Sequence, residues 1–349
     1  MKKILTLVLC LCMMLTMVTV FASCGKADYK LGMGVVVSMD SSKTGTAQVD
    51  ATVATVVTDA DGKIVACRID VAQNAMAVAE GAVKTDATFK TKMEKGTEYG
   101  MAGKVDNDDN GVMLEWDAQA KAFEAWVVGK TAAEIKDMAT QEANGHTIAV
   151  DSALLEAGCS MQITDFRDAV VKACNDDQGM SFKATEGSFT LGVAAKTTAA
   201  DSTAATAEAN GTVKMYTDFA ATVVVDGKIV AALNDAIQPN ITINAAGEIV
   251  EKSFKATKRE LKEDYNMAKY GASMDWNKDG KVLEWYLQSA EFSKYVVGKT
   301  ATEVADIATQ VVEGAGYVIA ADDALLTAGC TIQITAIKAV VAQAANNAR

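Results

Sequence analysis

Residues 219–233 read FAATVVVDGKIVAAL, and this stretch predicts two β-strands joined by a tight turn. The residues on either side of Asp226-Gly227 are mostly valine, isoleucine and alanine, and an Asp-Gly pair tolerates the positive φ angles that a two-residue hairpin turn needs. A similar stretch lies earlier in the chain, where Asp61-Gly62-Lys63-Ile64-Val65-Ala66 follows the apolar run 53–58. The chain therefore contains the same predicted hairpin twice.

The repeat extends well beyond this hairpin. Three other motifs return in the same order, between 165 and 171 positions later, and they are Asp70-x-x-Gln73 with Asp235-x-x-Gln238, Glu115-Trp116-x-x-Gln119 with Glu284-Trp285-x-x-Gln288, and Ala157-Gly158-Cys159-Ser160 with Ala328-Gly329-Cys330-Thr331. A unit of roughly 150 residues is a typical domain size. The matches predict two modules, at 31–174 and 186–349, joined by a linker at 175–185.

Helices are predicted after the strands of each module. Trp116, Phe123 and Val127 fall on one face at helical spacing. Capping boxes then indicate a second helix start in each module, at Thr131-x-x-Glu134 and at Thr300-x-x-Glu303. A short strand and a terminal helix close each module, at 159–163 and 164–173 in the first and at 330–334 and 335–345 in the second. We therefore expect an α+β fold of two tandem repeats, each a twisted antiparallel sheet packed against helices.

The N-terminus predicts export. Two lysines precede the apolar run 4–21, and Phe21-Ala22-Ser23-Cys24 closes the run with small residues before a cysteine. This pattern is typical of a secretory signal peptide, here 1–23, and it resembles the lipobox of bacterial lipoproteins. The resemblance implies that Cys24 is lipidated and that 24–30 tether the chain to the outer face of the bacterial cell membrane. A transmembrane anchor is the other interpretation, although the run is short for a span of about 20 residues.

Composition excludes several classes of function. The formal net charge of −12 opposes binding to a phosphate backbone, so nucleic acid is not expected as a partner. The chain has one histidine, His146, which removes histidine-based catalytic triads and most catalytic zinc sites from consideration. His146 has no counterpart in the second module, and its polar neighbours indicate a solvated loop. No nucleophile–base pair recurs at a recognisable spacing, so we do not expect an enzyme.

The order of motifs in each module resembles the bacterial FMN-binding domain family. Domains of that family open on a strand, an Asp-Gly-Lys-Ile turn and a second strand, and they close on a Ser-Gly-Ala-Thr signature before a helix. Here Ala328-Gly329-Cys330-Thr331 stands at the signature, with Ala157-Gly158-Cys159-Ser160 as its counterpart. In the family a separate transferase can join FMN to the signature threonine.

Carried over to this chain, the resemblance implies that Ser160 and Thr331 are the acceptor hydroxyls for FMN, with Gly158 and Gly329 beside them. It also implies electron transfer outside the cytoplasm to a redox partner, with the flavin as the electron carrier. The other interpretation of the Gly-Cys-Ser and Gly-Cys-Thr junctions is ordinary helix-entry chemistry.

Two acidic loops predict calcium binding. Their candidate ligands follow the first half of a calcium-binding loop, with oxygen donors at positions 1, 3 and 5 before a glycine, and they are Asp106, Asp108 and Asn110 in the first module and Asp275, Asn277 and Asp279 in the second. Position 12 should hold a bidentate carboxylate, but it is Asp117 in one loop and Tyr286 in the other. A polar surface turn is the other interpretation.

The recurring tryptophans and glutamines form the last group of candidates. A ligand pocket between sheet and helix is predicted if these side chains converge, and they are Gln73, Gln119, Trp116, Gln238, Gln288 and Trp285. The other interpretation is that tryptophan fills the core and glutamine bonds the backbone. At the level of the whole protein, flavin-mediated electron transfer has one alternative. That alternative is a non-redox surface lipoprotein for solute binding or adhesion, with calcium as a possible stabiliser.

Overall fold

The computed structural model describes residues 26–104, 106–269, 275–276 and 280–349. The described chain is an α+β fold in which several antiparallel sheets pack against helices. The predicted signal peptide and Cys24 lie outside the described residues. Among the residues that the structure describes, no helix is both long enough and apolar enough to cross a bilayer.

The first half of the chain forms a four-stranded antiparallel sheet. Its order is β3-β2-β1-β6, and the strands are β1 (Ala27–Ser38), β2 (Thr46–Thr58), β3 (Ile64–Ala77) and β6 (Met180–Ala184). Strand β1 begins inside the expected tether, and Tyr29 is buried. The expected linker 175–185 contains β6, which pairs with β1. Each of these two segments therefore contributes residues to the sheet.

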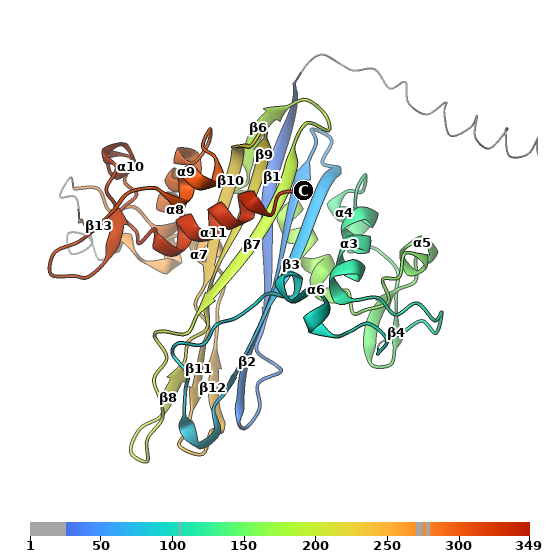
Figure 1. Cartoon of the computed structure of the whole chain (residues 1–349), viewed down its shortest axis with the longest axis horizontal. Coiled ribbons are helices and arrows are strands. Elements are labelled where there is room, and N and C mark those ends of the chain that lie inside the picture. Colours follow the sequence, from blue (N-terminus) through green and yellow to red (C-terminus); the bar gives the residue numbers. More distant parts are fainter. Residues whose placement is uncertain (1–25, 105, 270–274, 277–279) are drawn as a thin grey trace, which may run out of the picture.

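The second half forms a three-stranded sheet of order β10-β9-β7, with β7 (Thr190–Thr198), β9 (Tyr216–Val225) and β10 (Lys228–Ile237). The hairpin predicted at Asp226-Gly227 is confirmed. Both turn residues have positive φ, 50° and 75°, as the tightest hairpin turns require. A smaller sheet of β8 (Gly211–Val213), β11 (Asn240–Ile243) and β12 (Ile249–Ser253) continues from the opposite end of these strands, away from the Asp226-Gly227 turn (Figure 1).

The two large sheets pack face to face and share one core. Side chains alternate along β1, so that Leu31 and Met33 enter this core, which also contains Phe219 and Val223 from β9. Strand β2 is buried without interruption from residue 51 to residue 58, because its other face is covered as well. Apolar side chains on both faces of a strand are expected where both faces of the sheet are covered.

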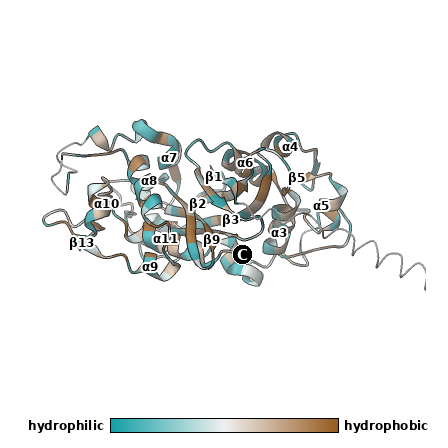
Figure 2. Cartoon of the chain, turned by 90° about the horizontal axis from the view of Figure 1, so that it is seen from above, coloured by the Kyte–Doolittle hydropathy of each residue, from teal (hydrophilic) through white to brown (hydrophobic). Residues whose placement is uncertain are grey.

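Helices cover the outer face of each sheet (Figures 1 and 2). On the first sheet they are α2 (Lys92–Lys95), α3 (Trp116–Trp126), α4 (Ala132–Lys136), α5 (Ser152–Glu156) and α6 (Thr164–Cys174). On the second they are α7 (Lys258–Leu261), α8 (Trp285–Tyr295), α9 (Ala301–Ala305), α10 (Asp323–Thr327) and α11 (Thr335–Asn346). Each set packs on its own apolar cluster. The layers therefore run helices, sheet, sheet, helices.

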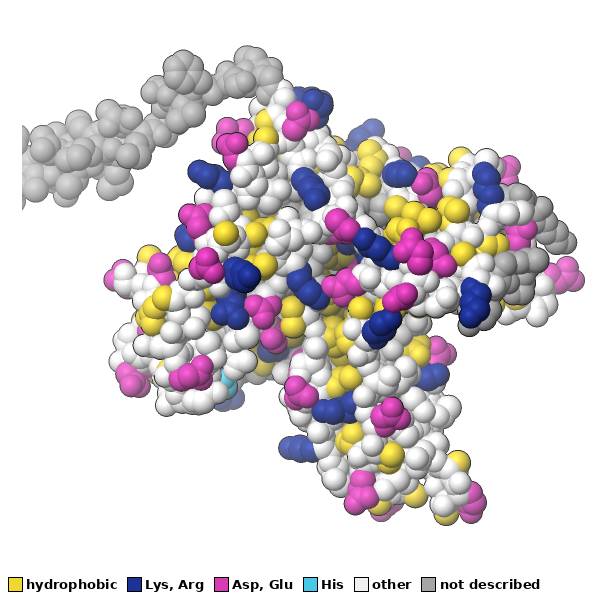
Figure 3. Space-filling model, turned by 180° about the vertical axis from the view of Figure 1, so that it is seen from behind, with side chains coloured by type: hydrophobic (Ala, Val, Ile, Leu, Met, Phe, Trp, Pro, Cys, Tyr) yellow, Lys and Arg dark blue, Asp and Glu magenta, His cyan; other side chains and the backbone are white. Residues whose placement is uncertain are grey.

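Short 3₁₀ turns and two small hairpins complete the chain. The turns are η1 (Ala79–Gly81), η2 (Gly96–Tyr99) and η3 (Lys262–Tyr265), and the hairpins pair β4 (Thr140–Ala143) with β5 (His146–Ala149) and β13 (Thr309–Val311) with β14 (Val318–Ala320). Beyond the helices, the strands extend as a narrow projection (Figure 1). On the face seen in Figure 3, acidic and basic side chains are interspersed rather than separated.

The terminal helices approach their sheets at glycines. A Cβ atom at Gly32 of β1 would lie 2.0 Å from the carbonyl oxygen of Ala173 in α6. At Gly192 of β7 it would lie 1.9 Å from the carbonyl oxygen of Ala344 in α11. Real Cβ atoms do not approach so closely, so only glycine allows each helix to sit at this distance.

The predicted helix starts are confirmed, whereas one pair of predicted strands is wrong. Capping boxes join Thr131 with Glu134 and Thr300 with Glu303. Residues 159–163 and 330–334 are not strands. The reason in the first half is that the backbone N–H groups of Ser160 and Met161 donate to the side chain of Gln119 and not to a neighbouring strand.

Candidate functional site

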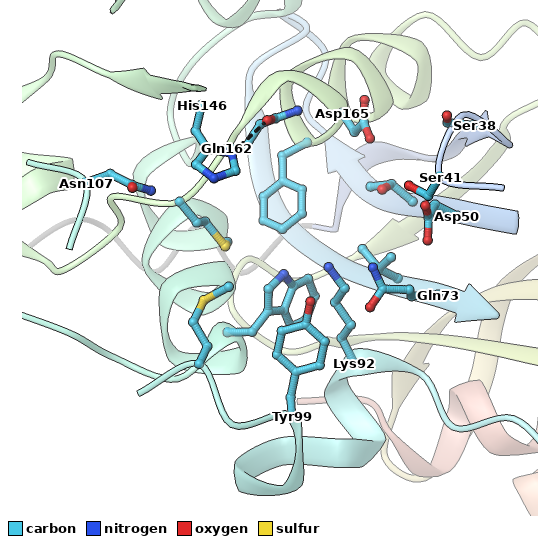
Figure 4. Close-up of a pocket in the computed structure, with 16 residues that line it drawn as sticks. Ser38, Ser41, Asp50, Gln73, Lys92, Tyr99, Asn107, His146, Gln162 and Asp165 are labelled. Carbon is cyan, nitrogen blue, oxygen red and sulfur yellow. Dashed lines mark hydrogen bonds between the residues drawn. The ribbon is translucent and has the colours of Figure 1, made fainter. Parts of the chain in front are cut away.

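Each half has a cavity between its sheet and its helices. The first cavity measures about 490 Å³ and is lined from β2, β3, α2, α3 and α6 (Figure 4). The second measures about 730 Å³ and is lined from β7, β9, α7, α8 and α11, and by Gln238 just after β10. Positions that recur in the sequence line both cavities, and they are Gln73 with Gln238, Lys92 with Lys258, Tyr99 with Tyr265, Met101 with Met267, Trp116 with Trp285, and Gln162 with Gln333.

A lysine beside two aromatic rings lies in each cavity. The Lys92 Nζ atom is 4.9 Å from the ring centroid of Tyr99 and 5.4 Å from that of Trp116. The corresponding distances from Lys258 to Tyr265 and Trp285 are 5.1 and 5.2 Å. An ammonium group within about 6 Å of a ring is attracted by the electrons of the ring face. These contacts hold each lysine against the aromatic wall of its cavity.

A buried aspartate positions the helix that carries each lysine. The Asp70 Oδ1 atom accepts hydrogen bonds from the backbone N–H groups of Val71 and Met93, at 2.7 and 3.1 Å. Asp235 accepts the equivalent bonds from Ala236 and Arg259, at 2.7 and 3.0 Å. Burial raises the pKa of Asp70 to about 7 and that of Asp235 to about 6, against the lowering effect of these hydrogen bonds.

The raised pKa of Asp70 predicts a pH dependence of stability. Because the folded-state pKa of about 7 lies above the unfolded value of 3.8, the contribution of Asp70 favours folding fully below pH 3.8 and is lost as the pH rises through 7. Nearby Glu94 adds to the shift. We expect Asp70→Asn to flatten the fall in unfolding free energy between about pH 4 and pH 7. Urea titrations of the variant and the native chain across this range measure the difference, and parallel curves would contradict the prediction.

The glutamines of the Glu-Trp-x-x-Gln helices bond the backbone. Gln119 is fully buried, and its Oε1 atom accepts from the N–H groups of Ser160 and Met161 at 3.1 and 3.0 Å, while its Nε2 atom donates to the Leu114 carbonyl at 2.9 Å. Gln288 makes the equivalent bonds to Thr331 and Leu283, both at 2.7 Å. These two side chains hold the backbone at Ser160 and Thr331. Gln288 also lines the second cavity, but its hydrogen bonds leave it little capacity for a ligand.

The other predicted polar and aromatic residues are divided between cavity and core. Gln73 and Gln238 are half-buried and line the cavities, and Gln238 accepts a hydrogen bond from Tyr265 at 3.0 Å. Trp116 and Trp285 are only 2% and 3% exposed. Most of each indole therefore belongs to the core, and a thin edge reaches the cavity.

The predicted flavin acceptors are almost fully buried, although Thr331 lines the second cavity. Ser160 is 1% exposed, and Thr331 is 2% exposed with its hydroxyl 3.3 Å from Gln288 Oε1. Gly158 and Gly329 have φ angles of 83° and 95°, which glycine adopts without strain. A transferase needs an accessible hydroxyl, so these residues do not fit FMN joined through Ser160 and Thr331 in the folded chain. Binding of FMN without a covalent bond stays a prediction.

The predicted calcium loops use their own oxygens for hydrogen bonds. Asp106 accepts from the N–H groups of Asn110 and Gly111, at 3.2 and 2.8 Å, and Asp108 accepts from the Asn110 amide at 2.7 Å. Asp275 accepts from the Gly280 N–H at 2.9 Å, while Asn277 and Asp279 lie outside the described residues. In the described part of the chain, no three histidine, cysteine, aspartate or glutamate residues form a group that could hold a metal ion.

Several lining residues were missed by the sequence reasoning. Asp50 of β2 and Asp165 of α6 face the first cavity, and His146 closes one end of it with its Nδ1 atom 3.2 Å from Gln162 Oε1 (Figure 4). Among the other lining residues, the recurrence of Lys92, Tyr99, Met101 and Gln162 was visible in the sequence. Comparisons with known protein families, curated proteins and solved structures found no match to this chain.

Proposed function

We propose that the chain is an extracytoplasmic, lipid-anchored protein that captures small molecules, with one binding cavity in each of two tandem modules. The observation that carries this proposal is the recurrence of one set of side chains, namely lysine, tyrosine, tryptophan, methionine and two glutamines, around both cavities. If these side chains served only to fill the core, they would pack against one another and leave no cavity between them in either half.

The chemistry of the walls supports ligand binding. Cavities of about 300–1,000 Å³ with apolar walls and a few fixed polar groups are typical of small-molecule sites. Here aromatic and methionine side chains form the apolar part, while lysine and glutamine supply donors and acceptors. Asp70 and Asp235 hold the lysine-bearing helices, so the donors are preorganised.

Contacts across the two halves support the tandem arrangement. The Glu94 carboxylate of α2 accepts a hydrogen bond from Gln343 of α11 at 2.7 Å. The Glu260 carboxylate of α7 pairs with Lys172 of α6, also at 2.7 Å. The terminal helix of each half thus bonds the lysine-bearing helix of the other half. Two related modules packed about an approximate twofold axis would make such a reciprocal pair of contacts.

Thermal unfolding of the full chain tests the proposal. The chain is produced in a bacterial host, extracted in detergent, and heated with FMN or with a panel of amino acids, sugars and aromatic amines. We expect at least one compound other than FMN to raise the midpoint, because a ligand of the folded state stabilises it by about 2.7 kcal/mol at 100 times its Kd. For a compound that carries no ammonium group, replacing both cavity lysines, Lys92→Met with Lys258→Met, should remove that rise.

A matched surface variant separates binding from general stability. Lys183 is 65% exposed and pairs with Asp28 away from both cavities, so Lys183→Met should leave the rise unchanged. If no compound raises the midpoint, the proposal is wrong. If FMN alone raises it, the flavin alternative replaces solute capture.

A further inference from the structure

The two cavities differ in their charged groups. Asp50 and Asp165 line the first cavity, with Lys92 as the lysine among its lining residues. In the second cavity the position of Asp165 is occupied by Ala336, and Asp218 is accompanied by two lysines, Lys196 and Lys258. Both lysines lower the pKa of Asp218, although burial raises it overall, to about 6. The lining of the first cavity therefore contains more carboxylates than lysines. The lining of the second contains equal numbers of each, because Asp201 is its other acid.

The lysine of the first cavity does not pair directly with its carboxylates. Within the described chain, neither Asp50 nor Asp165 forms a salt bridge, and the Lys92 ammonium lies against the rings of Tyr99 and Trp116. The partner of Asp50 is the neutral amide of Gln48, at 2.9 and 3.0 Å. Asp165 is half-buried in the first turn of α6.

The two acids reach the cavity from different elements. Asp50 projects from β2 beside Ser38 and Ser41, and Asp165 projects from α6 above the aromatic floor (Figure 4). Burial, together with the charges of Asp168 and Asp50, raises the pKa of Asp165, against the lowering effect of Lys92. The two carboxylates therefore repel each other above an apolar wall. A cation bound between them would reduce this repulsion.

We propose that the first cavity binds its ligand through a protonated amine, held between Asp50 and Asp165, with the organic body of the ligand against Tyr99, Met101 and Phe166. This inference rests on the proposed function and names the ligand class of one of its two sites. An organic ammonium ion supplies both parts, because its charge meets the carboxylates and its carbon body covers the apolar wall. The second cavity does not share this preference.

Three indole compounds of similar shape test the proposal by calorimetric titration of the full chain. They are tryptamine, which carries an ammonium group, tryptophol, which is neutral, and indole-3-propionate, which is an anion. We expect tryptamine to bind about tenfold more tightly than tryptophol, the factor that one charge-assisted hydrogen bond typically supplies, and indole-3-propionate to bind more weakly than both. Asp50→Asn and Asp165→Asn should each remove most of the tryptamine advantage and leave tryptophol binding within about twofold.

Two further variants localise the effect. Asp61→Asn removes one negative charge from the exposed turn between β2 and β3, and it should leave the ratio of affinities unchanged. Asp218→Asn changes the second cavity only, and it should also leave the ratio unchanged. The ammonium proposal is overturned if the three compounds bind equally, or if Asp61→Asn lowers tryptamine binding as much as Asp165→Asn does. Equal binding would leave the capture function intact, whereas a chain that binds neither these compounds nor any in the thermal panel would contradict both.

Discussion

Replacing Asp176 with alanine is expected to lower the free energy of unfolding by about 3–5 kcal/mol, the usual cost of breaking a buried ion pair. Asp176 follows α6, and both its carboxylate oxygens accept hydrogen bonds from Arg259 of α7, at 3.1 and 3.0 Å. Both side chains are only 7% exposed. The substitution leaves the Arg259 guanidinium buried without its counter-ion, and it also removes the acceptor of the Met33 N–H.

A double variant and a surface control make this prediction specific. Asp176→Leu with Arg259→Met removes both charges, so it should recover part of the loss, because well-packed apolar pairs replace buried ion pairs at little cost. Lys183→Met breaks an exposed pair whose side chains are 65% and 70% exposed, and it should cost less than about 1 kcal/mol. Urea denaturation of the four chains supplies the values. Equal losses in the buried and exposed pairs would show that the contact between the halves is not a major source of stability.

Gly32→Ala is expected to destabilise the fold by about 3 kcal/mol, as is Gly192→Ala. A single methyl group would stand 2.0 Å from the Ala173 carbonyl or 1.9 Å from the Ala344 carbonyl, and neither is the end of a flexible side chain. The terminal helix must therefore move off its sheet, which also disturbs the cavity wall that its first turn forms.

The control for these variants is a glycine in open space. Gly45 has a φ of 81°, and no atom lies within 4 Å of the position that an alanine methyl group would take there. Gly45→Ala should therefore cost only the conformational term of about 1–2 kcal/mol. The midpoints and slopes of urea denaturation measure all three changes. A loss at Gly32 no greater than at Gly45 would mean that the helix adjusts freely.

The parts of the fold that depend on local chemistry were predictable. The Asp226-Gly227 turn, the face of α3 and the Thr131 capping box are each specified by a few neighbouring residues, and all are present. The packing of one sheet on the other was not predicted. The hydrophobic pattern of a strand shows that one of its faces is covered, but it does not identify the element that covers it. Uninterrupted burial of β2 follows from this packing.

The candidate site was predicted only in part. Gln73, Gln238 and the tryptophans were located by recurrence, but Gln119 and Gln288 serve the backbone because the junction at Ser160 leaves N–H groups that need acceptors. Asp50, Asp165 and His146 lie far apart in the sequence and carry no motif, so only the folded chain brings them to one cavity. Buried Ser160 could not be distinguished in the sequence from an exposed hydroxyl.

The shared core has a consequence for how the chain is made. Synthesis delivers the first sheet before the second, and until β9 arrives the face that carries Leu31 and Met33 has no cover. A nascent chain with an exposed apolar sheet face is prone to aggregate until that face is covered. The N-terminal half is therefore the intermediate most exposed to aggregation during synthesis, and a partner that covers this face would protect it. A ribosome-stalled chain that ends before residue 190 should be sensitive to protease, whereas the completed chain should resist it.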